Sequence, residues 1–195
     1  MEKKSGIHSK ILSTAQEVFT RFGYGKTTME DIAKEMGKGK SSIYYYFTSK
    51  EDIFKAVIEK ELQVMKTRVL DAVSEHEDPR EKLKVYVGER MHGLKSLPNL
   101  YNVLRAEFTL QPDFVGEIRQ QTEKEEIAIV TGILDKGVED GTFNLEDTML
   151  TSIAIVTALK GMEIPLLIAE TGGDNILEQR LDRLLDVLFF GIVKR

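Results

Sequence analysis

Apolar residues recur at helical spacing along almost every segment of this 195-residue chain that is long enough to classify. In the first such segment they lie on one face of a helix, at Ile7, Ile11, Leu12, Ala15, Val18, Phe19 and Phe22. No segment alternates apolar and polar residues with the β-branched enrichment that is typical of a strand. The sequence therefore predicts an all-α fold of about nine helices.

Glycines and a capping residue divide the first 50 residues into three predicted helices. Gly23 ends the first helix. Thr28 is a suitable N-cap for the second, because its hydroxyl can accept hydrogen bonds from N–H groups two or three residues later. Gly37 and Gly39 permit the positive φ of a tight turn, after which residues 40–47 are expected to form a short third helix. We predict an N-terminal domain over residues 1–50.

A larger helical body is predicted over residues 51–195. Ser49 with Asp52 resembles a capping box that opens a long helix toward Val73, and Asp78-Pro79 marks the start of the next helix. Turn residues then separate further predicted helices, which span residues 79–96, 99–108, a stretch that ends near 137, 146–170 and 174–193.

Residues 27–52, TTMEDIAKEMGKGKSSIYYYFTSKED, place a helix, a glycine-containing turn and a second short helix in succession. The second helix carries hydroxyls, a lysine and three consecutive tyrosines. This layout is typical of a helix-turn-helix motif, in which the second helix enters the major groove and the first braces it against the phosphate backbone. The sequence therefore predicts double-stranded DNA as the partner of this domain.

The net charge of −5 hides an uneven distribution of charged residues. Residues 1–50 hold nine basic and five acidic side chains, a balance of +4, so the remainder of the chain carries −9. Such asymmetry is typical of a module that meets a polyanion and of an acidic body that stays clear of it, although ordinary scatter in charge is an alternative.

Composition argues against several other classes of protein. The chain has no cysteine, which removes disulfides, thiolate zinc sites and thiol nucleophiles, and its three histidines are not spaced as a metal cluster. No glycine-rich phosphate loop or G-x-S-x-G turn is present, so we expect no enzyme activity, no cofactor and no metal. No apolar run approaches about 20 residues, and no signal peptide is evident. We expect a soluble, cytoplasmic protein without membrane contact.

The order of these residues closely resembles the DNA-binding domain of the TetR family of bacterial transcriptional regulators, over about residues 7–60. The resemblance rests on residues that occur together in register: Phe19, Gly23, Thr28, Asp31-Ile32-Ala33, Gly37, Ser42 to Phe47 and Ser49-Lys50-Glu51. It implies a dimeric repressor, or less often an activator, that binds a pseudo-palindromic operator. It also implies that residues 51–195 form a ligand-binding and dimerisation domain, whose small-molecule effector alters DNA affinity.

The DNA contacts are predicted from the motif and from this resemblance. In the family register Lys40 and Ser41 occupy base-facing positions, Tyr44 meets a phosphate, and Thr28 and Lys50 clamp the backbone. Capping the helix is the alternative role of the two serines. The full predicted set is Thr28, Lys38, Lys40, Ser41, Ser42, Tyr44, Tyr46 and Lys50.

Neighbouring positions carry different expectations. Ile43 and Phe47, four residues apart, are expected to pin the recognition helix to the core. Tyr45 is the tyrosine that we expect to pack inward. Lys38 and Glu30 depart from the family pattern. Lys38 could add a phosphate contact or remain solvated, and Glu30 puts a base contact from the second helix in doubt.

The last two predicted helices carry more apolar surface than one core-facing stripe requires, and the resemblance pairs them with their mates in a homodimer. A helix buried within one protomer is the alternative for the first of the two. The predicted dimer residues are Ile155, Leu159, Leu181, Leu184, Leu185, Leu188 and Phe189.

An effector pocket is expected among the helices between residues 79 and 170. Its apolar character suits a small apolar effector such as a drug-like molecule or an acyl chain, although most of the candidates are expected to prove core. Pro165 is expected to kink its helix. The candidate lining residues are Tyr86, Met91, Leu94, Leu104, Phe108, Ile133, Met162 and Pro165.

A function of another class fits part of the same pattern. The chain could be a helical adaptor whose N-terminal module binds a protein and not DNA. Binding that weakens steeply with salt would indicate phosphate contacts, and binding that is insensitive to salt would favour the adaptor.

Overall fold

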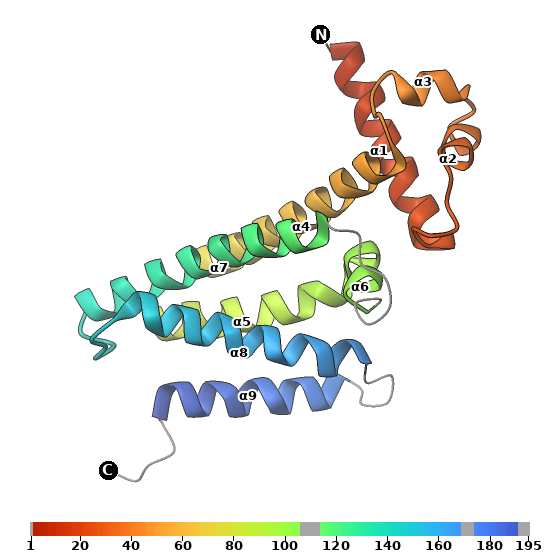
Figure 1. Cartoon of the computed structure of the whole chain (residues 1–195). Helices are drawn as coiled ribbons and strands as arrows, with labels where there is room; N and C mark the ends of the chain where they lie inside the picture. Colours follow the sequence, from red (N-terminus) through yellow and green to blue (C-terminus); the bar gives the residue numbers. More distant parts are fainter. Residues whose placement is uncertain (1, 106–113, 169–173, 191–195) are drawn as a thin grey trace. The chain divides into compact units, whose positions relative to one another are not determined.

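The computed structural model describes residues 2–105, 114–168 and 174–190 (Figure 1). These residues form helices and no strand, which confirms the all-α prediction. The helices are α1 (Glu2–Phe22), α2 (Met29–Glu35), α3 (Lys40–Tyr44), α4 (Lys50–Ser74), α5 (Pro79–Lys95), α6 (Pro98–Arg105), α7 (Phe114–Glu139), α8 (Thr148–Ile168) and α9 (Asp174–Phe190).

Several helix boundaries differ by one or two residues from those predicted, and two differ more. α1 begins at Glu2 and not at Ile7, because its first residues are polar helix formers that add nothing to an apolar pattern. α3 ends at Tyr44, three residues before Phe47, because the Tyr46 N–H bonds to the carbonyl oxygen of Ile43 at 2.9 Å and tightens the last turn. The predicted end of the sixth helix, at residue 108, lies outside the described residues.

The chain divides into two compact units. The first comprises Met1–Val64 and Ser96–Ile118, and the second comprises Met65–Lys95 and Arg119–Arg195. The division falls within α4 and within α7, whereas the sequence places a domain boundary at residue 50. Both helices are continuous through the division, so neither a linker nor a change of composition marks it in the sequence.

The first unit is built around α1, which contacts α2, while α2 contacts α3. Its core includes a cluster of aromatic rings at the start of α4. The Phe54 ring lies 4.8 Å from the Phe19 ring and 4.6 Å from the Tyr24 ring, measured between centroids. Phe114 approaches the same ring at 6.1 Å. This packing fixes α1 and the segment after it to the first turns of α4.

A buried carboxylate joins three helices of the first unit, α1, α4 and α6. The side chain of Glu61 on α4 accepts hydrogen bonds from Gln16 Nε2 at 3.0 Å and from Asn99 Nδ2 at 2.8 Å. It also accepts one from the backbone N–H of Leu100 at 3.0 Å, in the first turn of α6. The carboxylate therefore satisfies a helix N–H that has no partner within its own helix.

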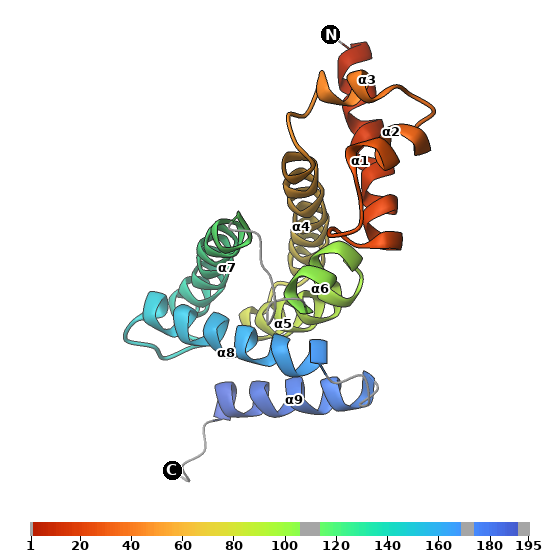
Figure 2. The same ribbon diagram turned by 45° about the vertical axis from the view of Figure 1, so that its right-hand side comes forward.

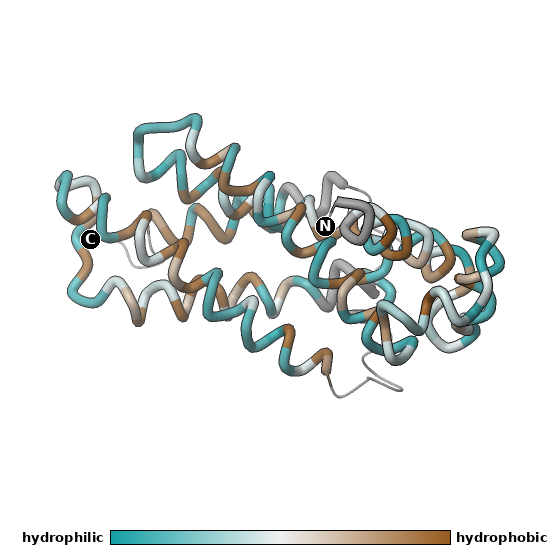
Figure 3. Tube along the Cα trace, turned by 90° about the horizontal axis from the view of Figure 1, so that it is seen from above, coloured by the Kyte–Doolittle hydropathy of each residue, from teal (hydrophilic) through white to brown (hydrophobic). Residues whose placement is uncertain are grey.

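The second unit packs α5 against α8 and α9. α8 and α9 lie side by side in two views (Figures 1 and 2). Hydrophobic and hydrophilic residues alternate along the described helices (Figure 3), as expected where each helix buries one face. Within the described ranges, no helix is long and apolar enough to cross a membrane.

Candidate nucleic-acid interface

The short helix α3 has one buried and one exposed side. Ile43 is fully buried and Phe47, in the turn after the helix, is nearly so, which confirms the prediction that these two residues are core. Lys40, Ser41 and Ser42 at the start of α3 are exposed. The buried pair holds the helix against the unit, so the opposite side is available to a partner.

Thr28 is the N-cap of α2, as predicted, and with Asp31 it forms a capping box. The Thr28 hydroxyl accepts a hydrogen bond from the Asp31 backbone N–H at 3.2 Å, and the Asp31 carboxylate accepts one from the Thr28 N–H at 2.9 Å. The Thr28 hydroxyl also donates to the same carboxylate, which lowers the pKa of Asp31. A phosphate contact by this hydroxyl would compete with Asp31.

The turn between α2 and α3 uses one left-handed glycine. Gly37 has φ of 63°, which a side chain would strain, and the next N–H, that of Lys38, bonds to the Ala33 carbonyl oxygen at 2.9 Å. Gly39, for which we also expected a positive φ, is the N-cap of α3 with φ of −74°. Only the first glycine is therefore needed for the sharp turn.

The Lys40 ammonium, predicted to face a base, forms an ion pair with the Glu30 carboxylate on α2. The hydrogen bond between them lowers the pKa of Glu30 and raises the pKa of Lys40. Lys40 Nζ also lies 5.5 Å from the centroid of the Tyr44 ring. Glu30 and the Tyr44 ring therefore hold the ammonium over the first turn of α3.

One of the three consecutive tyrosines, Tyr45, does not point as predicted. Tyr45, expected to pack inward, is 65% exposed, whereas Tyr46 is half-buried and Tyr44 is 44% exposed. The inward direction is set by Ile43 and Phe47, and at about 100° per residue Tyr46 lies beside that stripe while Tyr45 lies across the helix from it. The Tyr45 and Tyr46 rings meet edge to face at 5.0 Å.

Lys50, the predicted phosphate clamp at the start of α4, has a partner within the protein. Its Nζ donates to the carbonyl oxygen of Tyr24 at 2.8 Å and lies 4.3 Å from the centroid of the Tyr24 ring. An ammonium has three donors, so this bond leaves capacity for a phosphate. Lys38, the other lysine predicted to meet phosphate, is exposed in the turn before α3.

The predicted effector residues lie in several environments. Tyr86, Met91, Leu94 and Ile133 are buried in the second unit, and Met162 is half-buried. α8 continues through the Pro165 position to Ile168. The side chains of Leu104, Phe108 and Pro165 lie outside the described part of the structure.

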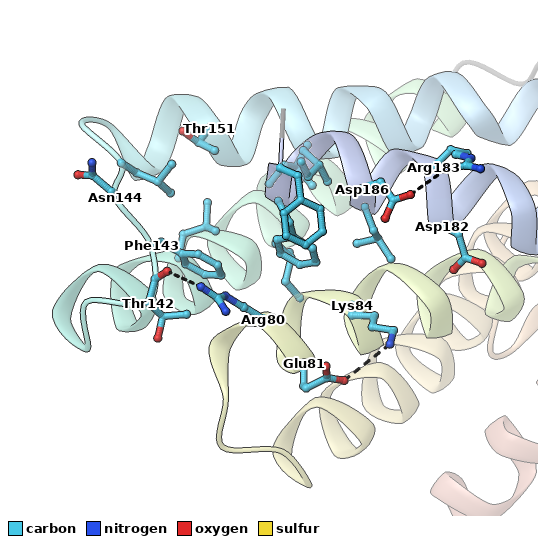
Figure 4. Close-up of a pocket in the computed structure, with 18 of the residues that line it drawn as sticks. Arg80, Glu81, Lys84, Thr142, Phe143, Asn144, Thr151, Asp182, Arg183 and Asp186 are labelled. Carbon is cyan, nitrogen blue, oxygen red and sulfur yellow. Dashed lines mark hydrogen bonds and ion pairs between the residues drawn. The ribbon is translucent and has the colours of Figure 1, made fainter. Parts of the chain in front are cut away.

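Four of the predicted dimer residues, Ile155, Leu159, Leu181 and Leu185, are instead buried within the protomer. Ile155 and Leu185, with Leu188 and Phe189, line a groove of about 1170 Å³. The groove is also lined by Arg80 and Lys84 of α5 and by Phe143 of the 141–145 segment, so α5, α8, α9 and this segment of one chain all contribute to it (Figure 4). The prediction is corrected for the four buried residues, because helical periodicity does not say which apolar stripe faces inward, whereas Leu184, Leu188 and Phe189 are half-buried.

Other apolar residues on the same two helices are exposed. On α8 they are Met149, Leu150 and Ile153, and on α9 they are Val187 and Phe190. Leu150 is 64% exposed and Phe190 is 79% exposed. Side chains of this size at neighbouring helical positions are typical of a surface that another protein covers.

A buried ionic cluster in the second unit was not anticipated from the sequence. Arg90 on α5 pairs with Glu126 on α7 and with Glu163 on α8. The signal that could have revealed it is the position of Arg90, four residues after Tyr86 and four before Leu94 on the apolar face of α5. A charged residue on such a face requires a buried partner of opposite charge.

The chain is similar to known bacterial transcriptional regulators. The family described as bacterial regulatory proteins, tetR family, matches residues 11–57. The HTH-type transcriptional regulator YfiR of Bacillus subtilis is 31% identical over 73% of this chain and 70% of that protein. The fatty acid metabolism regulator protein of the same organism is 28% identical over 72% of this chain and 73% of that protein.

The fold is shared with a solved structure of the transcriptional regulator FadR from Bacillus subtilis in complex with stearoyl-CoA. The TM-score is 0.75 and the identity 24%, over 95% of this chain and 99% of that one. The YfiR match covers most of both chains, and the family match spans the helix-turn-helix that α2 and α3 form. The chain therefore belongs to the TetR family and is a DNA-binding transcriptional regulator.

Proposed function

We propose that this regulator is a homodimeric repressor that binds a pseudo-palindromic operator through α3 and leaves it when a small effector binds the second unit. The observation that carries the proposal is the two-sided character of α3. Ile43 and Phe47 hold the helix to the core, while Lys40, Ser41 and Tyr44 are exposed on it. A lysine at this position can donate to guanine O6 and N7, and a serine or tyrosine can donate to a base or a phosphate.

Dimerisation is proposed through the exposed apolar residues of α8 and α9, in place of the buried residues first expected. Met149, Leu150 and Ile153 are one and then three residues apart, so they lie on one stripe of α8. A single helix-turn-helix reads too few base pairs to select one genomic site, and two-fold pairing doubles the site that is read.

Effector control is proposed from the fold and the relatives. One of the relatives is a fatty acid metabolism regulator, and a FadR of the same fold was solved with stearoyl-CoA, which supports a small effector with an apolar part. α4 is a continuous helix whose residues to Val64 belong to the first unit and whose remainder belongs to the second. An effector that prefers a different position of α4 from the one that DNA prefers would weaken operator binding.

The proposal is tested by selecting bound duplexes from a random DNA pool with the purified full chain. We expect one enriched site with two-fold symmetry. The Tyr44→Ala and Lys40→Ala variants should lose that site, while Lys124→Ala, which removes an exposed lysine from α7, should retain it. Enrichment of an asymmetric site that one protomer occupies would contradict the dimer, and loss of selectivity in the Lys124→Ala control would contradict the role of α3.

A salt titration distinguishes binding to DNA from binding of the N-terminal module to a protein. Each phosphate contact contributes a slope of about −0.9 to the dependence of log affinity on log salt for duplex DNA. We expect several such contacts in each dimer. A flat salt dependence would contradict phosphate binding by this module.

A further inference from the structure

Three ionised side chains form a buried cluster in the second unit, one from each of α5, α7 and α8. Arg90 Nε donates to Glu126 Oε1 at 2.6 Å, and Arg90 Nη2 donates to Glu126 Oε2 at 3.1 Å. Arg90 Nη2 also donates to Glu163 Oε1. All three residues are less than a tenth exposed, so the charges interact with little screening by water.

The cluster holds more negative than positive charge. Two carboxylates face one guanidinium, so the ionised cluster carries one surplus negative charge. The lysines of the neighbouring ion pairs have carboxylates of their own: Lys66 pairs with Glu125 at 2.7 Å and Lys160 with Glu123 at 2.8 Å. Among the described residues, Glu126 and Glu163 therefore form ion pairs with Arg90 and with no second cation.

A buried hydroxyl without a partner lies beside these charges. Tyr86 is 1% exposed, and its hydroxyl has no hydrogen-bond partner among the described residues. Tyr86 precedes Arg90 by four residues, so the two side chains share one face of α5. Burial, followed by the charge of Glu126, raises the pKa of this hydroxyl. A neutral hydroxyl can both donate and accept, and leaving it unpaired in a buried place is unfavourable.

We propose that this cluster anchors a protonated nitrogen of the effector, an inference that rests on the proposed effector control. An ammonium group would donate to the Glu163 carboxylate and to the Tyr86 hydroxyl oxygen, and its charge would balance the surplus negative charge. The apolar part of the ligand would pack near Met91, whose sulfur already accepts from Arg90 Nη1 at 3.3 Å. The effector class is therefore a small apolar amine.

The same charges disfavour an anionic group at this position. A carboxylate or phosphate beside Arg90 would raise the surplus negative charge from one to two in a buried environment. A neutral alcohol could bond to Tyr86 but would leave the charge unbalanced. Ligands that differ only in this group should therefore bind most tightly as the amine, less tightly as the alcohol and least tightly as the carboxylate.

The test uses three probes of the same chain length, octylamine, 1-octanol and octanoate, added to the purified full chain at pH 7. Calorimetric titration should give an affinity for octylamine that is about tenfold or more above that for octanoate. Octylamine should also raise the Tm and release the selected operator duplex. Octanoate binding as tightly as octylamine, or an absence of binding by all three probes, would overturn the proposal.

Two variants assign the effect to the cluster. Glu163→Gln removes the surplus charge while keeping the shape of the side chain, and Tyr86→Phe removes the hydroxyl. Each should lower octylamine affinity about tenfold, and Glu163→Gln should abolish the preference over octanol. Glu146→Gln, an exposed carboxylate of the same unit, should leave both affinities unchanged. Unchanged octylamine binding by Glu163→Gln with a native Tm would refute the assignment.

Operator binding is measured in the same samples before any probe is added. If the chain selects an operator but does not prefer octylamine, the amine site is contradicted and the function as a DNA-binding regulator is not. If the chain prefers octylamine but octylamine does not release it from its operator, the proposed effector control is contradicted and the amine site is not. The two failures are therefore distinguishable.

Discussion

The ammonium of Lys40 on α3 is paired with the carboxylate of Glu30 on α2. This ion pair links the helix expected to read DNA to the helix that precedes it, at positions ten residues apart. Both side chains are about half exposed, so water and salt weaken the pair, and its importance lies in the direction it gives to Lys40 and not in stability.

Glu30→Gln should strengthen binding to unrelated DNA more than binding to the selected operator. The change removes a negative charge near the phosphates and releases Lys40 from its fixed direction. We expect about a twofold to tenfold gain in affinity for unrelated duplex and a steeper salt dependence, by about one unit of slope. Fluorescence anisotropy over a salt series measures both. Glu17→Gln on α1 is the control, and an equal gain for both variants would show that Glu30 has no specific role.

Thr28→Ala should destabilise the first unit in a way that depends on pH. The variant loses the side chain that caps α2 and the hydrogen bond from the Thr28 hydroxyl, which is the largest cause of the lowered pKa of Asp31. A carboxyl whose pKa is lowered on folding stabilises the protein above its unfolded pKa, here near 3.8, and this contribution is lost as pH falls through the folded value. The Tm should therefore fall by several degrees at pH 7.

The difference in Tm between wild type and Thr28→Ala should narrow as the pH is lowered toward 3. Thermal scans by circular dichroism at a series of pH values measure it. Thr20→Ala, which removes another threonine of the same unit, should show a difference that changes less with pH, since its hydroxyl bonds to Gln16 O and to Asn99 and not to a carboxylate. A constant difference in the Thr28→Ala scans would argue against the Asp31 contribution.

Arg90→Met should destabilise the second unit strongly. It leaves the carboxylates of Glu126 and Glu163 buried without a cation, and breaking a buried ion pair in this way costs about 3–5 kcal/mol. Urea denaturation of the purified protein measures the change. Adding Glu126→Gln and Glu163→Gln to the same variant should recover much of the loss, because no buried charge then remains in the cluster. A loss that the triple variant does not recover would point to packing by Arg90 and not to its charge.

Leu150→Glu should convert the protein from a dimer to a monomer. The change places a charge within the exposed apolar stripe of α8, where two copies are proposed to meet. Sedimentation velocity should show the smaller species, and operator affinity should fall about a hundredfold as two-site binding is lost. Val138→Glu, at a partly exposed apolar position on α7, is the control. A Leu150→Glu protein that remains dimeric would place the interface elsewhere.

The sequence predicted those features that depend on local chemistry. Thr28 caps α2, Pro79 opens α5, and Ile43 with Phe47 holds α3, because capping, proline and helical spacing act over a few residues. Features that depend on which neighbour covers a face were missed. Tyr45 was expected inside and is exposed, while Leu159 was expected at an interface and is buried in its own protomer.

The ionic cluster shows a second reason why the site could be predicted only in part. Arg90, Glu126 and Glu163 are 36 and 37 residues apart in succession, and nothing in their local sequence states that they meet. Long-range pairing of charges follows from how α5, α7 and α8 pack, which helical spacing alone does not specify. The same holds for Glu30, whose direction toward Lys40 depends on the turn at Gly37.

The buried carboxylate of Glu61 makes α1 and α6 mechanically dependent on each other. Pulling the first turn of α6 away from α1 would strip Glu61 of the hydrogen bonds from Asn99 and Leu100, in a place where water cannot replace them at once. Each lost bond to a buried charged group costs about 1–3 kcal/mol. A small displacement of α6 therefore costs less free energy when α1 moves with it. We expect α1 and α6 to move together within the first unit.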